Sequence, residues 1–361
     1  MPGSENRAGL DVARRIRAFL DPGATEPPTR KLEEAQRKLD ELRRKLAQKD
    51  RRLERKEKEV AELRAELAQR GAGGGDYGVK PENVVWIFAT ARSGTTWLGD
   101  MMAEMPGHTR WNEPLVGGLL GHFYYGRAGS RADKKGKYFI LGERYKKTWV
   151  EPVRSLVLGG AAARFPELDE SRYLVIKEPN GSIGAPLLME AMPESRMILV
   201  VRDPRDVVAS RIDARKEGSW RHERGKREGR PIKEFSGEDL NTYVEGTANA
   251  YLQSVGNAKT AYDAHEGRKA LVRYEDLRSD TSNVMNRIYS ELDIAVDEED
   301  LARSVQKHAW ENIPADQKGE GKFYRKASPG GWREDLTEEQ ITIVEEITGP
   351  LLEEFYPERK G

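Results

Sequence analysis

The stretch IFATARSGTTWLGDMM, residues 87–102, reads as the end of a buried strand, a turn of small residues and the start of a helix. Such a turn at a helix N-terminus presents free backbone N–H groups, which bind phosphate well. The common loop for nucleoside triphosphates follows the pattern G-x-x-x-x-G-K-[ST]. In the corresponding run, Ala89 replaces the first glycine, Thr95 replaces the lysine, and the basic residue is Arg92. The stretch therefore predicts a phosphate-binding loop without the lysine that holds a γ-phosphate.

Short apolar segments alternate with helical segments over the rest of the chain. The expected strands are residues 84–89, 173–177, 197–201 and 269–274. The expected helix starts are Thr95, the neighbourhood of Pro204, Ser236 and Thr337. Asp239 and Gln340 follow the last two of these by three residues, which is the spacing of a capping box. The alternation predicts one α/β domain over residues 80–361, with a parallel sheet flanked by helices.

The sequence before this domain has a different character. Residues 30–71 carry an apolar residue at every seventh position, and these seam residues are Leu32, Leu39, Leu46, Leu53, Val60 and Leu67. A strict seven-residue repeat predicts a long left-handed coiled coil, which would make the protein a homo-oligomer. Lys49 and Lys56 lie at the second seam position, so a single charged helix is the alternative.

Two shorter segments flank the predicted coiled coil. Residues 1–29 hold a short basic amphipathic helix followed by a proline-containing linker. Such a helix docks on its own protein, or alternatively contacts a membrane surface or a partner. Residues 72–79 are rich in glycine and are expected to form a flexible hinge.

The composition excludes several classes of protein. The net charge is zero, which argues against a general nucleic-acid-binding protein. The chain has no cysteine, and therefore no disulfide or thiolate metal site. The longest apolar runs fall far short of the roughly 20 residues that span a bilayer. The N-terminus lacks the apolar core of a secretory signal, so we expect a cytoplasmic protein.

Three further motifs follow the loop in chain order. VVRDPRDVVASR places Arg202 eight residues before Ser210, LVRYEDL contains Tyr274, and RKASPGGWRE begins at Arg325. Together with RSGTTW, these motifs resemble the sulfotransferases that use 3′-phosphoadenosine 5′-phosphosulfate (PAPS). The resemblance implies a P-loop NTPase-like sulfotransferase fold, PAPS as co-substrate and no metal ion.

The resemblance also assigns roles in donor binding. Arg92 would hold the 5′-phosphosulfate, and the loop residues that would cradle it are Ser93, Gly94, Thr95 and Thr96. The residues that would hold the 3′-phosphate are Arg202, Ser210, Arg325 and Lys326. Tyr274 would lie beside the adenine, and Trp97 would either stack on the adenine or pack in the core. Ala327 stands where glycine is common in the late loop of the family.

Sulfuryl transfer to a hydroxyl needs a group that accepts the proton of that hydroxyl. In cytosolic members of the family this group is a histidine two residues after a strand-end lysine. Here Lys177 is followed by Glu178 and Pro179. Glu113 lies 21 residues after Arg92, as in the branch of the family that sulfates protein tyrosines and some carbohydrates. The resemblance therefore predicts Glu113 as general base and Lys177 as a cation on the transferring group.

The sequence leaves several alternatives open. Glu113 would also suit a surface loop and Lys177 a strand end, with His108 or His122 then serving as the base. A different enzyme class, an ATP-dependent kinase of the same fold, would require magnesium. A third possibility is an inactive globular domain attached to a coiled-coil scaffold.

Two segments interrupt the alternating pattern of the domain. Residues 121–149 are rich in aromatic residues and cations, and residues 213–235 are mildly basic. By resemblance such segments line or cover the acceptor cleft, whereas solvated charged loops are the alternative. If they bind the acceptor, their charge favours an anionic or extended one, such as a glycan, a lipid headgroup or a peptide. The sequence does not identify the acceptor.

Overall fold

The computed structural model describes residues 77–131, 139–324 and 329–357, with scattered residues of a helical stretch between 33 and 56. The chain divides into two units, Met1–Gly74 and Gly75–Gly361. The second unit contains the predicted α/β domain.

The predicted N-terminal segments lie mostly outside the described residues. These include the basic helix at 1–29, much of the coiled coil at 30–71 and most of the hinge at 72–79. Leu39 and Leu46, both on the expected seam, lie in helical residues and are exposed on the single chain. Their pairing with a second chain stays a prediction.

In the described part of the second unit, five parallel strands form one sheet in the order β2-β3-β1-β4-β5. The strands are β1 Val84–Phe88, β2 His108–Asn112, β3 Tyr173–Lys177, β4 Arg196–Val201 and β5 Lys269–Arg273. The four expected strands are confirmed to within one residue at either end. The sequence did not predict β2, because HTRWN contains no run of apolar residues.

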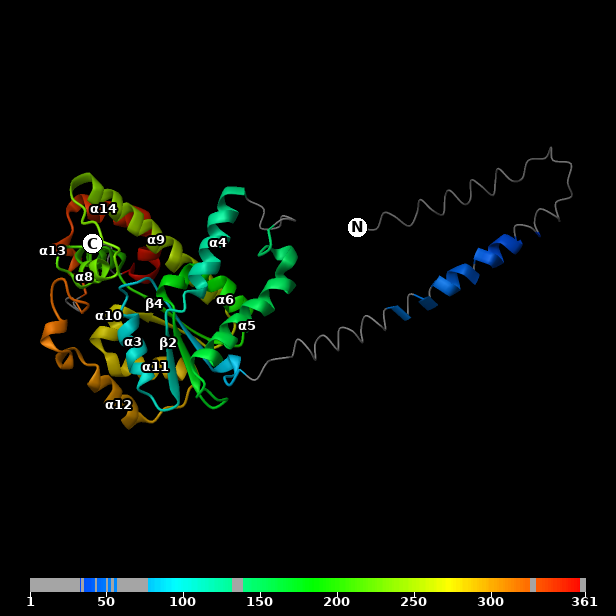
Figure 1. The fold of residues 1–361 in the computed structure, drawn as a ribbon, viewed down its shortest axis with the longest axis horizontal. Helices are drawn as coiled ribbons and strands as arrows, with labels where there is room; N and C mark the ends of the chain where they lie inside the picture. Colours follow the sequence, from blue (N-terminus) through cyan, green and yellow to red (C-terminus); the bar gives the residue numbers. More distant parts are fainter. Residues whose placement is uncertain are drawn as a thin grey trace. The chain divides into compact units, whose positions relative to one another are not determined.

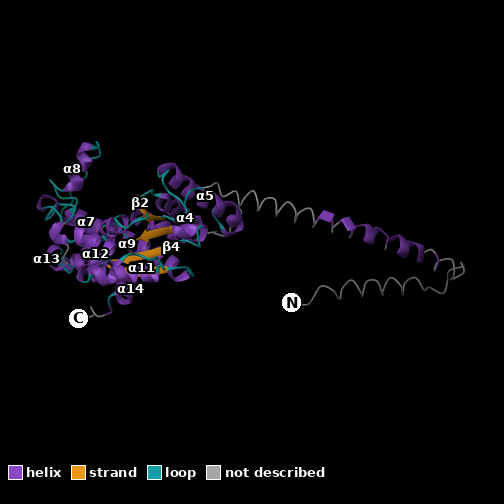
Figure 2. Ribbon diagram, turned by 90° about the horizontal axis from the view of Figure 1, so that it is seen from below, coloured by secondary structure: helices purple, strands orange, loops and turns teal. Residues whose placement is uncertain are grey.

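Helices cover both faces of the sheet (Figures 1 and 2). The α-helices are α3 Thr95–Ala103, α4 Val116–Arg131, α5 Lys146–Arg164, α6 Ala185–Ala191, α7 Pro204–Asp213, α8 Trp220–Arg227, α9 Gly237–Ala264, α10 Tyr274–Ser279, α11 Thr281–Glu291, α12 Glu298–Lys307, α13 Trp332–Asp335 and α14 Glu338–Phe355. The 3₁₀ helices are η1 Pro81–Asn83, η2 Glu143–Tyr145, η3 Pro179–Gly184, η4 Trp310–Asn312 and η5 Ala315–Gln317. The predicted α/β class is confirmed.

The predicted helix starts are also confirmed. α3 begins at Thr95 and α7 at Pro204. Thr337 precedes α14 and forms a capping box with Gln340. Ser236 precedes α9, but its side chain makes no capping hydrogen bond. The expected side-chain cap is therefore absent at this one position.

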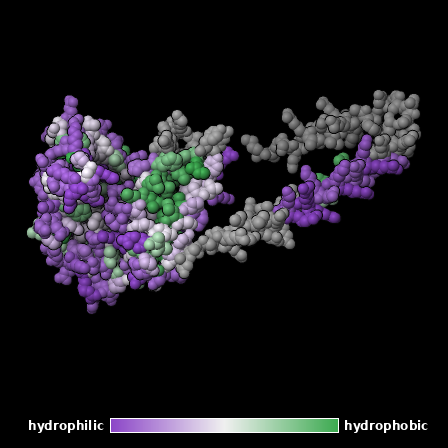
Figure 3. Space-filling view, viewed as in Figure 1, coloured by the Kyte–Doolittle hydropathy of each residue, from purple (hydrophilic) through white to green (hydrophobic). Residues whose placement is uncertain are grey.

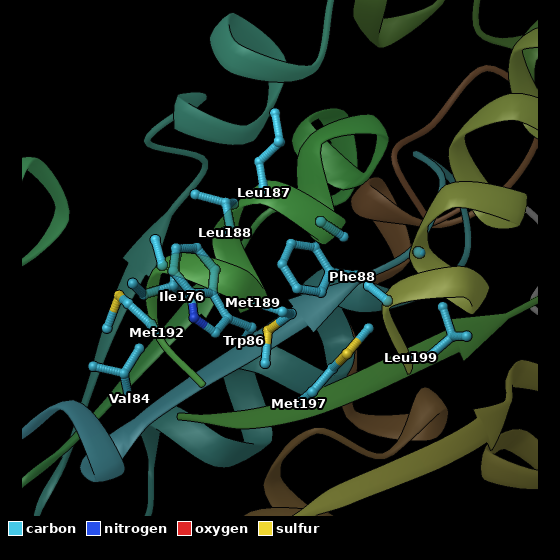
Figure 4. Packing of buried hydrophobic residues seen from close by; sticks show 14 of the residues in the cluster. Val84, Trp86, Phe88, Ile176, Leu187, Leu188, Met189, Met192, Met197 and Leu199 are labelled. Carbon is cyan, nitrogen blue, oxygen red and sulfur yellow. The ribbon is translucent and has the colours of Figure 1, made fainter. Parts of the chain in front are cut away.

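Alternate residues of the central strand face two different cores. Val84, Trp86 and Phe88 join the cluster that packs under α5, α6, α9 and α14. Val85 and Ile87 join the cluster under α3, α11 and α12. The rings of Trp86 and Phe88 stack with centroids 5.5 Å apart among leucine and methionine side chains (Figure 4). Burial of such a side chain stabilises the fold by about 1.5–3 kcal/mol, so β1 holds its loop firmly at the edge of the sheet.

The carboxyl ends of all five strands meet at one edge of the sheet, because the strands run parallel. The strand register places Ile87 of β1 and Asn112 of β2 on either side of Lys177 in β3. The residues that follow β1, β2 and β3 are therefore neighbours in space although they are far apart in sequence.

Apolar side chains gather on one face of the molecule over α4 and α5 (Figure 3). The exposed large apolar residues in and around these helices are Leu115, Leu119, Phe123, Ile140 and Leu156. Among the described residues, none of the helices has the length and apolar character needed to cross a membrane.

Candidate functional site

A pocket of about 650 Å³ opens at the carboxyl edge of the sheet. Residues that follow all five strands line it, as is usual for ligand sites of open α/β sheets. The predicted site residues that line it are Arg92, Gly94, Thr95, Thr96, Trp97, Glu113, Lys177, Arg202, Ser210 and Tyr274. Ser93 is fully buried and is not part of the lining. Arg325 and Lys326 lie outside the described residues.

The loop after β1 has a backbone that few residues adopt. Arg92 and Gly94 both have a φ of 78°, in the left-handed region. A Cβ at position 94 would lie 2.5 Å from the ring of Tyr274, so only glycine allows this close approach. α3 begins at the next residue, and the first amides of a helix have no partner within the helix. These amides, with the hydroxyls of Thr95 and Thr96, are available to an anion.

Glu113 and Lys177 form an ion pair at one end of the pocket. Lys177 Nζ donates hydrogen bonds to Glu113 Oε1 at 2.7 Å and to Thr96 Oγ1 at 3.2 Å. Asn180 Nδ2 donates to Glu113 Oε2 at 2.7 Å. The Lys177 side chain is 4% exposed and that of Glu113 is 29% exposed. The carboxylate is thus held at both oxygens while it remains open to the pocket.

Glu178, which is buried, fixes the turn that carries Glu113. Its two carboxylate oxygens accept hydrogen bonds from the amides of Leu115 and Gly117, each at 3.1 Å. Burial raises the pKa of Glu178 to about 7, although the two amide bonds oppose this rise. Sequence reasoning missed Glu178 and Asn180 as parts of the site. The available signal was a carboxylate placed directly after a buried strand.

A second cluster lies around Arg202 and Ser210. Arg202 Nη1 donates to the carbonyl oxygen of Arg92 at 2.7 Å, and its guanidinium lies 4.4 Å from the centroid of the Tyr274 ring. Arg92 Nε donates to Ser210 Oγ at 3.0 Å, and Nη2 donates to the carbonyl oxygen of Phe323 at 2.8 Å. The resemblance assigned Arg92 and Ser210 to opposite ends of the donor. In the structure these two side chains share a hydrogen bond.

Asp206 ties the late loop to α7. Its carboxylate accepts hydrogen bonds from the amides of Gly330 at 2.8 Å and Trp332 at 3.0 Å. Burial raises the pKa of Asp206, and the charge of Arg202 counteracts this effect. The sequence did not reveal this role, because Asp206 is more than 120 residues from the loop that it holds.

Trp97 and the two histidines occupy different positions relative to the pocket. Trp97 lines the pocket and also packs against the core under α3, with Nε1 donating to the carbonyl oxygen of His308 at 2.7 Å. His108 lies in β2, where its ring stacks on Tyr173 and burial lowers its pKa. Neither His108 nor His122 lines the pocket. Both alternative bases are therefore outside it.

The two interrupting segments also differ. From 213–235, the residues Ala214, Trp220, Arg221 and Arg224 line the pocket. None of the described residues of 121–149 does so. This segment instead forms the end of α4, η2 and the start of α5, beside the exposed apolar face. The expectation that it lines the cleft is not met in this pocket.

The described lining of the pocket is strongly cationic. Seven arginines and Lys177 line it, against the carboxylates of Glu113 and Asp206. Clusters of three or more histidine, aspartate or glutamate side chains suited to a metal ion do not occur among the described residues. The arrangement is suited to binding a ligand with several negative charges.

The sulfotransferase domain family matches residues 82–356, and the chain belongs to this family. A search of curated proteins gave no match. A mouse sulfotransferase solved in complex with PAP is 14% identical, covers 75% of this chain and 85% of its own, and has a TM-score of 0.45. A sulfotransferase from Mycobacterium avium is 15% identical over 77% of this chain and 78% of its own, with a TM-score of 0.44. The sulfotransferase domain of a Synechococcus olefin synthase is 17% identical over 73% and 94%, with a TM-score of 0.42.

Proposed function

We propose that the protein transfers the sulfuryl group of PAPS to a hydroxyl group of an acceptor. The observation that carries this proposal is the cluster of Glu113, Lys177 and Asn180 beside the N-terminus of α3. It combines a carboxylate that is able to accept a proton with a buried cation that stabilises developing negative charge. A kinase is disfavoured, because the loop has no lysine for a γ-phosphate and the chain belongs to the sulfotransferase domain family.

The residues of the pocket fit a donor that has two separate anionic groups. Oγ of Ser93 and Nε of Arg202 are buried and have no hydrogen-bond partner within the described residues. Arg202 and Ser210 would hold the 3′-phosphate, while the first amides of α3 and Lys177 would hold the 5′ end. Arg92 reaches Ser210, so we assign it to the donor between these two groups. When bound, PAPS supplies an activated sulfuryl group as a phosphate–sulfate anhydride.

Glu113 is proposed to take the proton of the acceptor hydroxyl. Each of its oxygens already accepts one hydrogen bond, and a carboxylate oxygen has a second lone pair for the acceptor. Asn180 fixes the orientation of the carboxylate. Lys177 bonds both Glu113 and Thr96, and it thereby links the base to the loop that holds the donor. The roles of these residues are positioning, proton transfer and charge stabilisation.

Calorimetric titration with 3′,5′-ADP (PAP), beside ATP with magnesium, tests donor recognition. We expect PAP to bind without a metal, and Arg202→Ala to weaken it by about tenfold or more, because the 3′-phosphate loses a charged partner. Binding of ATP with magnesium alone would overturn the proposal in favour of a kinase.

Replacement of Glu113 tests the base. Glutamine retains the size of the side chain and an oxygen for Lys177, but it does not take up the proton. Transfer from labelled PAPS by Glu113→Gln should therefore fall by about 100-fold or more, with PAP affinity unchanged. Full activity of this variant would exclude Glu113 as the base. A wild-type protein that binds PAP but never transfers sulfate would support the inactive-scaffold alternative.

A further inference from the structure

One wall of the pocket carries three arginines that the donor assignment leaves without a role. This wall, which we call the arginine wall, consists of Arg211 at the end of α7 and Arg221 and Arg224 on α8. The proposed donor contacts already use Arg92, Lys177 and Arg202. The pocket therefore holds more positive charge than those contacts account for.

The arginine wall lacks the carboxylates that would neutralise it. Arg211 Nη2 donates to Thr90 Oγ1 at 2.8 Å, and no carboxylate in the described part of the chain pairs with Arg211 or Arg221. Burial lowers the pKa of Arg211, and the nearby charge of Arg221 also lowers it. Arg224 pairs with Glu228 at 2.7 Å, but both side chains are exposed, and such pairs contribute little and exchange readily.

Contacts at its first turn anchor α8, whose residues Arg221 and Arg224 line the pocket. Ser219 caps the helix by accepting a hydrogen bond from the amide of His222, and the amide of Trp220 donates to Gly321 O at 2.8 Å. The ring of Trp220 contacts the edge of Phe323 with centroids 5.3 Å apart. This packing argues against a freely solvated loop.

The arginine wall and the proposed base Glu113 line the same pocket. The hydrogen bond and charge of Glu228 raise the pKa of Arg224, and the charge of Glu113 contributes to this rise. Arg224 is thus within electrostatic reach of the carboxylate that would receive the acceptor hydroxyl. The wall is left for the acceptor, because the proposed donor contacts use other residues of the pocket.

We propose that the arginine wall binds a negatively charged group of the acceptor, which is therefore a hydroxyl compound that carries a carboxylate, phosphate or sulfate. This inference rests on the proposed function. A guanidinium matches such oxyanions with two parallel hydrogen bonds. An acceptor anion would also relieve the mutual repulsion of Arg211 and Arg221. The arginine wall would thereby hold a negatively charged acceptor beside a negatively charged donor.

The test is calorimetric titration of the full-length protein saturated with PAP, so that the donor positions are filled. The probes are glucose, glucuronate and glucose 6-phosphate, which share a sugar scaffold and differ in their charge. We expect both charged sugars to bind at least about tenfold more tightly than glucose. The charged sugar that binds more tightly identifies the anion that the wall prefers. Equal binding of the three sugars, including no binding of any, would overturn the proposal.

Two variants assign the effect to the arginine wall. Arg221→Gln should weaken the charged sugars by about tenfold and leave PAP affinity within about twofold of wild type, which also shows that the variant is folded. Arg227→Gln removes the same charge from the same helix but lies outside the pocket lining, so it should bind all probes like wild type. Equal losses of PAP and sugar binding in Arg221→Gln would instead assign the wall to the donor. Failure of the wild type to bind PAP would refute the proposed function itself.

Discussion

Arg92 and Glu113 share a backbone conformation that is uncommon for residues other than glycine. Their φ values are 78° and 50°. Such conformations cost about 1–3 kcal/mol each and concentrate at functional sites, where the surrounding structure enforces them. The surroundings do so here, since the amide of Glu113 donates to Lys177 O at 2.8 Å. The sheet therefore holds the backbone of Glu113, while the carbonyl oxygen of Arg92 is held by the hydrogen bond that it accepts from Arg202.

At the residue scale, Gly94→Ala is predicted to disrupt donor binding. Gly94 and Gly107 have φ values of 78° and 73°, so alanine brings backbone strain at both positions. The new Cβ would meet the ring of Tyr274 at position 94, whereas no described atom lies within 4 Å of a Cβ at position 107. We expect Gly94→Ala to lower stability more than Gly107→Ala, and to weaken PAP by about tenfold or more.

Urea unfolding and PAP titration of both glycine variants check this prediction. Gly107→Ala is the matched control, since it should lose stability through strain alone and keep PAP affinity. If the two variants lose the same stability and both bind PAP like wild type, the contact between Tyr274 and the loop is not important for the site.

At the element scale, the edge strand β2 decides where the proposed base lies. Within the described part of the chain, β2 pairs only with β3, and Glu113 follows its last residue. The sequence HTRWN has neither an apolar run nor a strict alternation, since a partly exposed edge strand needs neither. The resemblance identified Glu113 by its spacing from Arg92. It could not reveal the strand that presents Glu113.

α4 packs on η3 so closely that only glycine fits at the contact. A Cβ at Gly117 would lie 2.2 Å from Gly181 O, and a Cβ at Gly121 would lie 2.5 Å from Gly184 N. The same segment is tied to β3 by Glu178, which accepts from the Gly117 amide. The turn that carries Glu113 is thus held at both ends.

Glu178 makes stability depend on pH in a defined direction. Its folded-state pKa of about 7 lies above its ordinary value of 4.5, so between these values the folded state binds more protons than the unfolded state. Stability should therefore be lost as pH rises from about 4.5 to about 7, by at most about 1.4 kcal/mol per pH unit. Glu178→Gln should remove this contribution, because glutamine does not titrate.

Urea unfolding at pH 5, 6 and 7 measures the effect. Glu167→Gln, an exposed control near β3, should keep the wild-type slope. Asp206 and Glu275, whose pKa values are also raised by burial, should still contribute in both variants. If the free energy of unfolding of Glu178→Gln depends on pH as steeply as that of the wild type, Glu178 does not titrate with a raised pKa in the folded state.

At the scale of the whole molecule, the parallel sheet is what assembles the pocket. Lys177, Arg202 and Tyr274 follow or end three different strands, yet all line one pocket. The common direction of the strands brings their carboxyl ends together at one edge of the sheet, and the residues that follow the strands therefore meet in one pocket. All the described residues that line the pocket therefore come from the second unit of the chain.

The predicted role of residues 30–71 is assembly of several chains. A seven-residue apolar repeat over this length should hold the full chain in an oligomer. Sedimentation of the full chain beside a chain that begins at Asp76 measures this. The shorter chain should form the smaller assembly and bind PAP as tightly per chain as the longer one. Equal assembly states would contradict the role of residues 30–71 in oligomerisation.

The sequence by itself determined the fold class, four of the strands and the turn between β1 and α3, because each of these depends on residues that are adjacent in the chain. Periodicity and motif spacing are local properties of the sequence, so they can be recognised without the tertiary structure. The tertiary structure alone decided that Asn180 and Lys177 hold Glu113, that Asp206 anchors the late loop, and that Arg211 and α8 form one arginine wall. These contacts join residues that are far apart in sequence, and only strand register and helix packing bring them together.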